Sequence, residues 1–275
     1  MSQPCPNCSS QQPDGARFCG DCGATLAATM VQGKTVLAPA GQPPAVTSHQ
    51  SPPPPAALTH QQLQPQSTFR PGAGSVPGSA THLMNQREHT IFVIDKSGSM
   101  AEPYDSRLTK VEAATRANAS MVLEKARIDP NDMIGIVAFE DFAMPILPLL
   151  PVGGRKRDII QALQTITAGG GTDINEGLKA ARDLFDWSRS DVVRRIVLLT
   201  DGHGGHPLHT AQELKARGVV IDVTGVGDSP ANVDERLLRQ IASVVQNELR
   251  YRFIKDQQTL VSHYTRIAGK TALGA

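Results

Sequence analysis

Three segments of the chain carry oxygen-bearing side chains directly after apolar or glycine-rich stretches. Asp95, Ser97 and Ser99 follow an apolar run, Thr172 closes a run of glycines, and Asp201 ends a second apolar run. Carboxylates and hydroxyls are the ligands that Mg²⁺ and Mn²⁺ prefer, whereas zinc favours nitrogen and sulfur. These five residues therefore predict a hard-cation site assembled from three separate loops.

The order of these segments resembles a known metal-binding pattern. D-x-S-x-S, then Thr in a glycine-rich loop, then T-D-G is similar to the metal-ion-dependent adhesion site (MIDAS) of von Willebrand factor A (vWA) domains, over about residues 88–275. The resemblance implies that Ser97, Ser99 and Thr172 are hydroxyl ligands of Mg²⁺. It implies that Asp95 and Asp201 hold the ion directly or through water.

The same resemblance implies what the site would do. Two carboxylates and three neutral hydroxyls leave an ion electron-poor with one position open, and members of this family commonly fill it with an Asp or Glu of a protein partner. Intracellular members often work with AAA-type ATPases or in kinase-linked assemblies. We therefore expect a protein partner of that kind.

The elements that must position these loops are strands alternating with helices. Apolar runs of strand length occupy residues 90–94, 133–139, 146–150, 195–200, 219–226 and 249–254. Between them, apolar residues recur at three- and four-residue spacing over 111–121, 159–166, 174–185, 233–244 and 260–267. This alternation predicts an α/β fold: a doubly wound, mostly parallel, Rossmann-like sheet flanked by helices. Pro145 and Pro148 favour an edge position for the third strand.

In such folds, binding crevices lie beyond the carboxyl ends of the strands. Asp95 and Asp201 both follow strand ends, so we expect the fold to bring them together. The glycines at 169–171 would let the Thr172 loop approach closely before a helix that begins at Asp173 or Ile174.

All four cysteines, Cys5, Cys8, Cys19 and Cys22, lie near the N-terminus. Two C-x2-C pairs separated by ten residues are typical of a tetrahedral S₄ zinc cage. This segment, residues 1–26, resembles the short N-terminal zinc ribbons of bacterial proteins. We expect a structural Zn²⁺ and a tight hairpin with Asp14-Gly15 at its turn. Disulfides and an iron centre remain alternatives, whereas a thioredoxin-like redox pair lacks the βαβ context that it needs.

Residues 27–87 have the composition of a disordered linker. Ten of the twenty prolines lie between Pro39 and Pro77, and Gln, Ser, Thr, Ala and Gly fill the rest. Gly33-Lys34-Thr35 is similar to the end of a phosphate-binding loop, but Ala28 stands where that loop needs glycine, so nucleotide binding is rejected. Thr35 is a possible phosphosite.

The composition of the whole chain argues against nucleic acids and membranes as partners. A net charge of +1 gives no footprint for nucleic acid, and the ribbon itself contains a single basic residue, Arg17. No run of eighteen apolar residues and no charged-then-apolar leader occurs, so we expect a cytoplasmic protein that does not span a membrane.

Two further hypotheses concern the chemistry of residues near the predicted metal site. His203, His206 and His209 have the spacing of a second, softer metal site, but Pro207 and the surrounding glycines favour a solvent loop. A metal-dependent hydrolase, phosphatase- or protease-like and aided by Asp173 and Glu176, is the alternative to a binding protein. No histidine base is predicted beside Ser97 or Ser99. We therefore expect a non-enzymatic adaptor that combines a vWA domain, a linker and a zinc ribbon.

Overall fold

The computed structural model describes residues 2–5, 9–13, 19, 26, 86–202 and 204–269. Cys8, Cys22, Thr35, His203 and the 27–85 part of the predicted linker lie outside these residues. The N-terminal segment and the larger unit are described separately below.

Two short strands form an antiparallel hairpin in the N-terminal segment. β1 (Ser2–Pro4) pairs with β2 (Gln11–Pro13), with Gln3 opposite Gln12. The connection between them runs through Cys5, whose backbone N–H donates to the Ser10 carbonyl at 2.9 Å. In the sequence, the first C-x2-C pair stands between these two strands. The turn expected at Asp14-Gly15 lies outside the described residues.

The larger unit is built on a six-stranded sheet with the order β10-β7-β6-β3-β4-β5. Its strands are β3 (Arg87–Asp95), β4 (Met133–Phe139), β5 (Ala143–Pro151), β6 (Val192–Thr200), β7 (Val220–Val226) and β10 (Tyr251–Ile254). All neighbours pair in parallel except β5, which runs antiparallel to β4. The predicted α/β class and the edge position of the proline-containing strand are thus confirmed.

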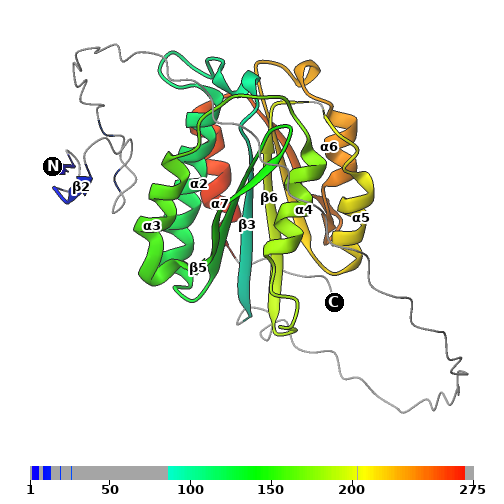
Figure 1. Cartoon of the computed structure of the whole chain (residues 1–275), viewed down its shortest axis with the longest axis horizontal. Coiled ribbons are helices and arrows are strands. Elements are labelled where there is room, and N and C mark those ends of the chain that lie inside the picture. The colour runs from blue at the N-terminus through cyan, green and yellow to red at the C-terminus, as the bar shows by residue number, and fades with distance from the viewer. Residues whose placement is uncertain are drawn as a thin grey trace, which may run out of the picture. The chain divides into compact units, whose positions relative to one another are not determined.

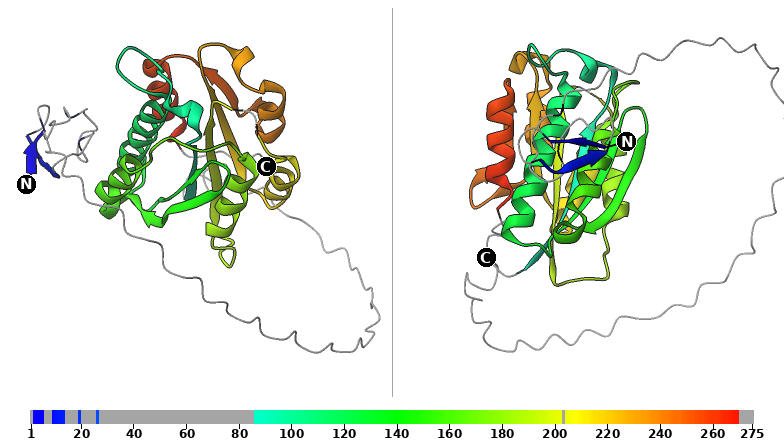
Figure 2. Two further views of the ribbon diagram at one scale, coloured as in Figure 1. Left: turned by 45° about the horizontal axis from the view of Figure 1, so that its top comes forward. Right: turned by 90° about the vertical axis from the view of Figure 1, so that its left-hand side faces the viewer.

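Helices cover both faces of this sheet, as Figures 1 and 2 show. Their bounds are α2 (Lys110–Ile128), α3 (Val152–Gln164), α4 (Ile174–Leu184), α5 (Leu208–Ala216), α6 (Glu235–Ile241) and α7 (Gln257–Ile267), with short 3₁₀ turns η1 (Gly98–Ala101) and η2 (Pro230–Asn232). One hydrophobic core packs α2, α3 and α7 against the sheet, and a second packs α4, α5 and α6 against the other face.

Alternation of side chains along the central strands explains the two cores. In β3, Phe92 and Ile94 belong to the core under α2, whereas Ile91 and Val93 belong to the core under α4. All four side chains are fully buried. A strand covered on both faces reads as a continuous apolar run, which is why this strand was recognisable in the sequence.

One helix prediction was too long. The apolar pattern through Val244 predicted a helix over 233–244, but α6 ends at Ile241 and Val244 begins β8 (Val244–Val245), which pairs with β9 (Glu248–Leu249). Val244 is 66% exposed, so it does not belong to the apolar stripe of α6. Leu249 belongs to β9 and pairs with Val244, and Arg250 separates it from β10, so the strand predicted at 249–254 is divided.

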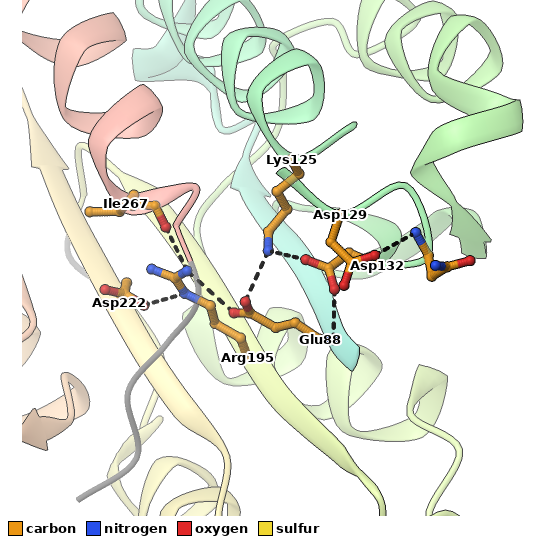
Figure 3. A network of polar contacts seen from close by, with 8 residues as sticks. Glu88, Lys125, Asp129, Asp132, Arg195, Asp222 and Ile267 are labelled. Atoms are coloured by element: carbon orange, nitrogen blue, oxygen red, sulfur yellow. Dashed lines mark hydrogen bonds and ion pairs between the residues drawn. The ribbon is translucent and has the colours of Figure 1, made fainter. Parts of the chain in front are cut away.

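Figure 3 shows a network of charged side chains buried between the sheet and the helices α2 and α7. Arg195 donates to Asp222 Oδ2 through Nε at 2.7 Å and to the Ile267 carbonyl through Nη1 at 2.6 Å. Glu88 accepts from Arg195 at 3.3 Å and from Lys125 at 3.0 Å. Lys125 also pairs with Asp132 at 3.1 Å, and that carboxylate accepts the Glu88 backbone N–H, so each buried charge has an opposite partner.

No helix within the described residues is both long enough and apolar enough to cross a membrane.

Candidate metal site

The oxygen-bearing residues that the sequence singled out meet at the carboxyl ends of two adjacent strands. Asp95 ends β3 and Thr200 ends β6, and these strands pair in parallel with Ile94 opposite Leu199. Asp201 follows at once. Topology therefore places the carboxylates of Asp95 and Asp201 side by side although they are far apart in the chain.

Asp95 is fully buried and held by two donors. Its Oδ1 accepts the backbone N–H of Ser97 at 2.8 Å, and its Oδ2 accepts the Thr200 hydroxyl at 2.5 Å. Burial raises the pKa of the Asp95 carboxyl to about 6, while the hydrogen bonds from Ser97 and Thr200 oppose that rise. Burial penalises a carboxylate that no cation compensates, so Asp95 is a group that gains from a positive charge beside it.

Hydroxyls connect the first loop to the third. Ser97 Oγ lies 3.1 Å from Ser99 Oγ, and Ser99 Oγ donates to Asp201 Oδ1 at 2.8 Å. Ser99 sits in η1, so this turn presents both hydroxyls toward the end of β6. Three of the five predicted ligands thus form one continuous chain of oxygens.

Thr172 completes the group from the second loop. A Cβ built on Gly202 would lie 3.2 Å from Thr172 Cγ2, 3.5 Å from Thr172 Oγ1 and 3.7 Å from Asp95 Oδ2. Thr172 and Asp95 therefore flank the same glycine. Gly98 N donates to the Gly170 carbonyl at 2.9 Å, which ties the first loop to the second. α4 begins at Ile174 with Asp173 as its N-cap, as predicted.

The sequence reading missed one charged residue at this site, Lys110. Its ammonium donates to Asp201 Oδ2 at 2.7 Å and to Glu102 Oε2 at 2.7 Å. Lys110 is the first residue of α2, whose start is fixed by a capping box between Thr109 and Glu112. The sequence did contain a sign of this. Lys110 lies one helical turn before the buried Ala113, so a charged residue falls on the apolar face of the helix.

The residues of the hydrolase reading are engaged elsewhere. Asp173 Oδ1 accepts the backbone N–H of Asn175 at 2.9 Å, and Glu176 pairs with Lys179 at 2.8 Å. Within the described part of the chain, the Ser97 and Ser99 hydroxyls hydrogen-bond to each other and to the carboxylates of Asp95 and Asp201, and no histidine is among these partners. Nothing in this arrangement activates a serine as a nucleophile.

Two of the predicted zinc ligands can be placed. Cys5 and Cys19 are both buried and pack with Leu26, and Cys19 Sγ lies 3.3 Å from Ser10 Oγ. Their proximity is compatible with one sulfur-rich cage, but Cys8 and Cys22 lie outside the described residues. Of the three histidines, His206 and His209 are exposed, and His209 belongs to α5.

A doubly wound sheet with a cluster of hard oxygen ligands at its carboxyl edge defines a class of binding domain, and comparisons with known proteins agree. Residues 90–203 match the family model for the von Willebrand factor type A domain. The calcium-activated chloride channel regulator 1 of Bos taurus is 28% identical over 191 residues, which are 69% of this chain and 20% of that protein.

Solved structures share the fold. A von Willebrand factor type A protein from Catenulispora acidiphila matches with a TM-score of 0.55 at 23% identity, over 67% of this chain and 42% of that one. Proximal thread matrix protein 1 from the mussel byssus, solved with a zinc-occupied MIDAS motif, matches with a TM-score of 0.53 at 23% identity, over 66% and 47%. Residues 90–203 thus match a von Willebrand factor type A domain, a type of domain that generally mediates protein interaction or adhesion, and the solved structures show the same fold.

The residues at the site fit a hard divalent cation. The donors are two carboxylates and three hydroxyls, and Gly202 leaves open the space that a Cβ would take between Thr172 and Asp95. Lys110 is the feature that departs from a plain oxygen cage, because it brings a positive charge against one of the two carboxylates.

Proposed function

We propose that the vWA domain binds a protein partner through a divalent cation, Mg²⁺ or Mn²⁺, held by Asp95, Ser97, Ser99, Thr172 and Asp201. The observation that carries the proposal is the chain of oxygens that joins Ser97, Ser99 and Asp201 beside Asp95. Four side chains separated by up to about a hundred residues would have no structural need to converge on one point if they were only polar loop residues.

The protein's own groups prepare the site. Ser97 N–H and the Thr200 hydroxyl hold the Asp95 carboxylate in one orientation, and Ser99 holds Asp201. When bound, the cation supplies an electron-poor centre whose open position accepts a carboxylate oxygen from the partner. We therefore expect the partner to present an Asp or Glu side chain.

We propose that the N-terminal segment is a second docking module, folded around a structural Zn²⁺ held by Cys5, Cys8, Cys19 and Cys22. The burial of Cys5 and Cys19 with Leu26 supports a compact segment. Together with the linker, the two modules would make the chain an adaptor whose weak contacts reinforce each other. An AAA-type ATPase or kinase-linked partner, phosphorylation of Thr35 and a cytoplasmic location stay predictions from the sequence.

Isothermal titration of the full chain with MgCl₂ tests the metal site, after dialysis without chelator so that zinc is retained. We expect one saturable Mg²⁺ site, and Asp201→Ala should weaken it at least about tenfold because one of two carboxylates is lost. Asp183→Ala, at an exposed carboxylate on α4, is the matched control and should leave the affinity unchanged. Equal affinities for the two variants would refute the site.

A pull-down then tests the partner. The full chain, Asp201→Ala and Asp183→Ala are each used as bait with and without Mg²⁺. A protein retained by wild type and Asp183→Ala only when Mg²⁺ is present supports metal-bridged binding. Retention of the same proteins by all baits in both conditions would contradict it.

A further inference from the structure

A pocket lies between β10 and α7, near the amino end of β10. It is away from the strand ends that carry Asp95 and Asp201. Its volume is about 160 Å³. The charged and titratable side chains that line it are Asp222, Glu248, Arg250, Arg252, His263 and Arg266. Arg250 directly precedes β10, Arg252 lies in β10, and His263 and Arg266 come from α7.

The arginines of this pocket have unused hydrogen-bond donors. Within the described residues, Arg252 and Arg266 form no ion pair, and Arg266 Nη2 donates only to His263 Nδ1, at 3.2 Å. The Nε of Arg250 is buried without a hydrogen-bond partner, and its Nη1 is 3.9 Å from Asp222 Oδ1. A buried donor without a partner costs free energy, so a ligand that accepts from it is favoured.

Some arginines elsewhere on the surface are already paired. Arg127, Arg155 and Arg189 each pair with a carboxylate two or three residues away.

The two acidic residues of the lining do not neutralise it. Asp222 Oδ2 already accepts a hydrogen bond from Nε of the fully buried Arg195 at 2.7 Å. The negative charge of Asp222 is therefore already balanced by a buried guanidinium group. Glu248 is exposed and forms no ion pair with the described arginines. Burial, and after it the nearby Arg266 and Arg252, lower the pKa of His263 to about 4, so His263 is neutral at pH 7.

We propose that this pocket binds a dianionic phosphate group, either free inorganic phosphate or a phosphate monoester. The guanidinium group presents planar, paired N–H donors that match phosphate oxygens, and three such groups from two elements surround the pocket. A phosphate dianion carries enough charge and enough acceptors to use the free donors of Arg250, Arg252 and Arg266 together. A singly charged carboxylate does not.

Titration of the full chain with inorganic phosphate, phenyl phosphate and acetate tests the proposal by calorimetry and by the Nε–Hε resonances of ¹⁵N-labelled arginine. We expect saturable binding of phosphate with a shift of the Arg250 resonance, and no saturation by acetate. Saturation by phenyl phosphate as well assigns the pocket to monoesters, whereas its exclusion assigns the pocket to free phosphate.

Arg252→Gln and Arg266→Gln change exposed side chains, so the fold is not at stake. Each should weaken phosphate binding at least about tenfold, because a charge-assisted hydrogen bond is lost. Arg127→Gln on α2 makes the same change in net charge and should have no effect. Equal weakening in all three variants, or acetate binding as tight as phosphate binding, would overturn the proposal.

Discussion

Lys110 places a positive charge at the candidate metal site, which no residue named by the sequence pattern supplies. Its ammonium is 2.7 Å from Asp201 Oδ2, so a divalent cation would bind next to a fixed positive charge. Replacing Lys110 by Met keeps the length of the side chain and removes that repulsion. We expect Mg²⁺ to bind roughly tenfold or more tightly to Lys110→Met, as judged from charges a few ångströms apart in a partly buried site.

Calorimetric titration with MgCl₂ measures this change, with Lys179→Met as the control. Lys179 pairs with Glu176 at 2.8 Å on the surface of α4, so its loss should leave Mg²⁺ binding unchanged. Weaker binding by Lys110→Met would mean that the ammonium serves to orient Asp201 and not to oppose the cation.

His263 makes a separate, pH-dependent contribution to stability. Burial lowers the pKa of the folded imidazole to about 4, against an ordinary value of 6.5. Between these two values the unfolded chain binds more protons than the folded chain, so the free energy of unfolding falls as the pH drops from about 6.5 toward 4. The loss attributable to His263 is at most roughly 3 kcal/mol.

Urea unfolding at pH 7 and pH 4.5 measures it. In His263→Gln the difference between the two pH values should shrink, whereas in His209→Gln, an exposed change on α5, it should stay as in wild type. An unchanged difference in His263→Gln would show that other groups account for the acid sensitivity.

At the residue scale the sequence predicted which oxygen-bearing side chains come together, but it missed their charged neighbour Lys110; that they bind a metal stays a prediction. Asp95, Ser97, Ser99 and Asp201 could be named because each follows a strand end or a characteristic turn. Lys110 was missed, because it acts from a helix start that is brought to Asp201 only by packing of α2 on the sheet.

At the scale of elements, the contact between α4 and the sheet depends on Gly177. A Cβ built there would lie 2.8 Å from Phe139 Cδ1 and 2.9 Å from Val93 Cγ1, closer than packed side chains allow. Gly177→Ala should therefore destabilise the domain by about 1–3 kcal/mol, because α4 or the strands must move.

Gly154→Ala is the matched control for this effect. No atom lies within 4 Å of a Cβ built on Gly154 in α3, and alanine favours helix by up to about 1 kcal/mol over glycine. In urea unfolding, Gly154→Ala should therefore raise the free energy of unfolding or leave it unchanged, whereas Gly177→Ala should lower it. A loss of similar size in both variants would argue that close packing at Gly177 is not the cause.

The bounds of an element could be predicted best where the element is fully buried. Strand β4 was found with its bounds correct, since a fully buried strand is a continuous apolar run. The end of α6 was missed, because Val244 continues the helical spacing although the chain has already turned into β8. The spacing of apolar residues cannot reveal a turn when an apolar residue after the turn continues the same spacing.

At the scale of the whole molecule, the buried charge network in Figure 3 joins β3, β6 and β7 to α2 and α7. Removing one member leaves its partners buried with less opposite charge beside them. We expect Arg195→Met to lower the free energy of unfolding by about 3–5 kcal/mol, because Glu88 and Asp222 both lose a cation. Chemical unfolding measures this loss.

The control is Arg189→Met, which breaks an exposed pair with Asp191 and should cost no more than about 1 kcal/mol. Similar losses for the two arginines would mean that the interior tolerates the unpaired carboxylates. The network could not be foreseen from the sequence, since Glu88, Lys125 and Arg195 are ordinary surface residue types whose burial only the fold reveals.

The outer strands of the sheet have a consequence for how the protein behaves when it is crowded. β5 carries Pro145, Pro148 and Pro151 among its nine residues, and each lacks a backbone N–H. β10, at the other edge, is only four residues long. A neighbouring chain thus finds few groups on which to add a strand, and edges blunted in this way resist amyloid-like stacking. The domain should remain dispersed at concentrations where open-edged sheets form fibres.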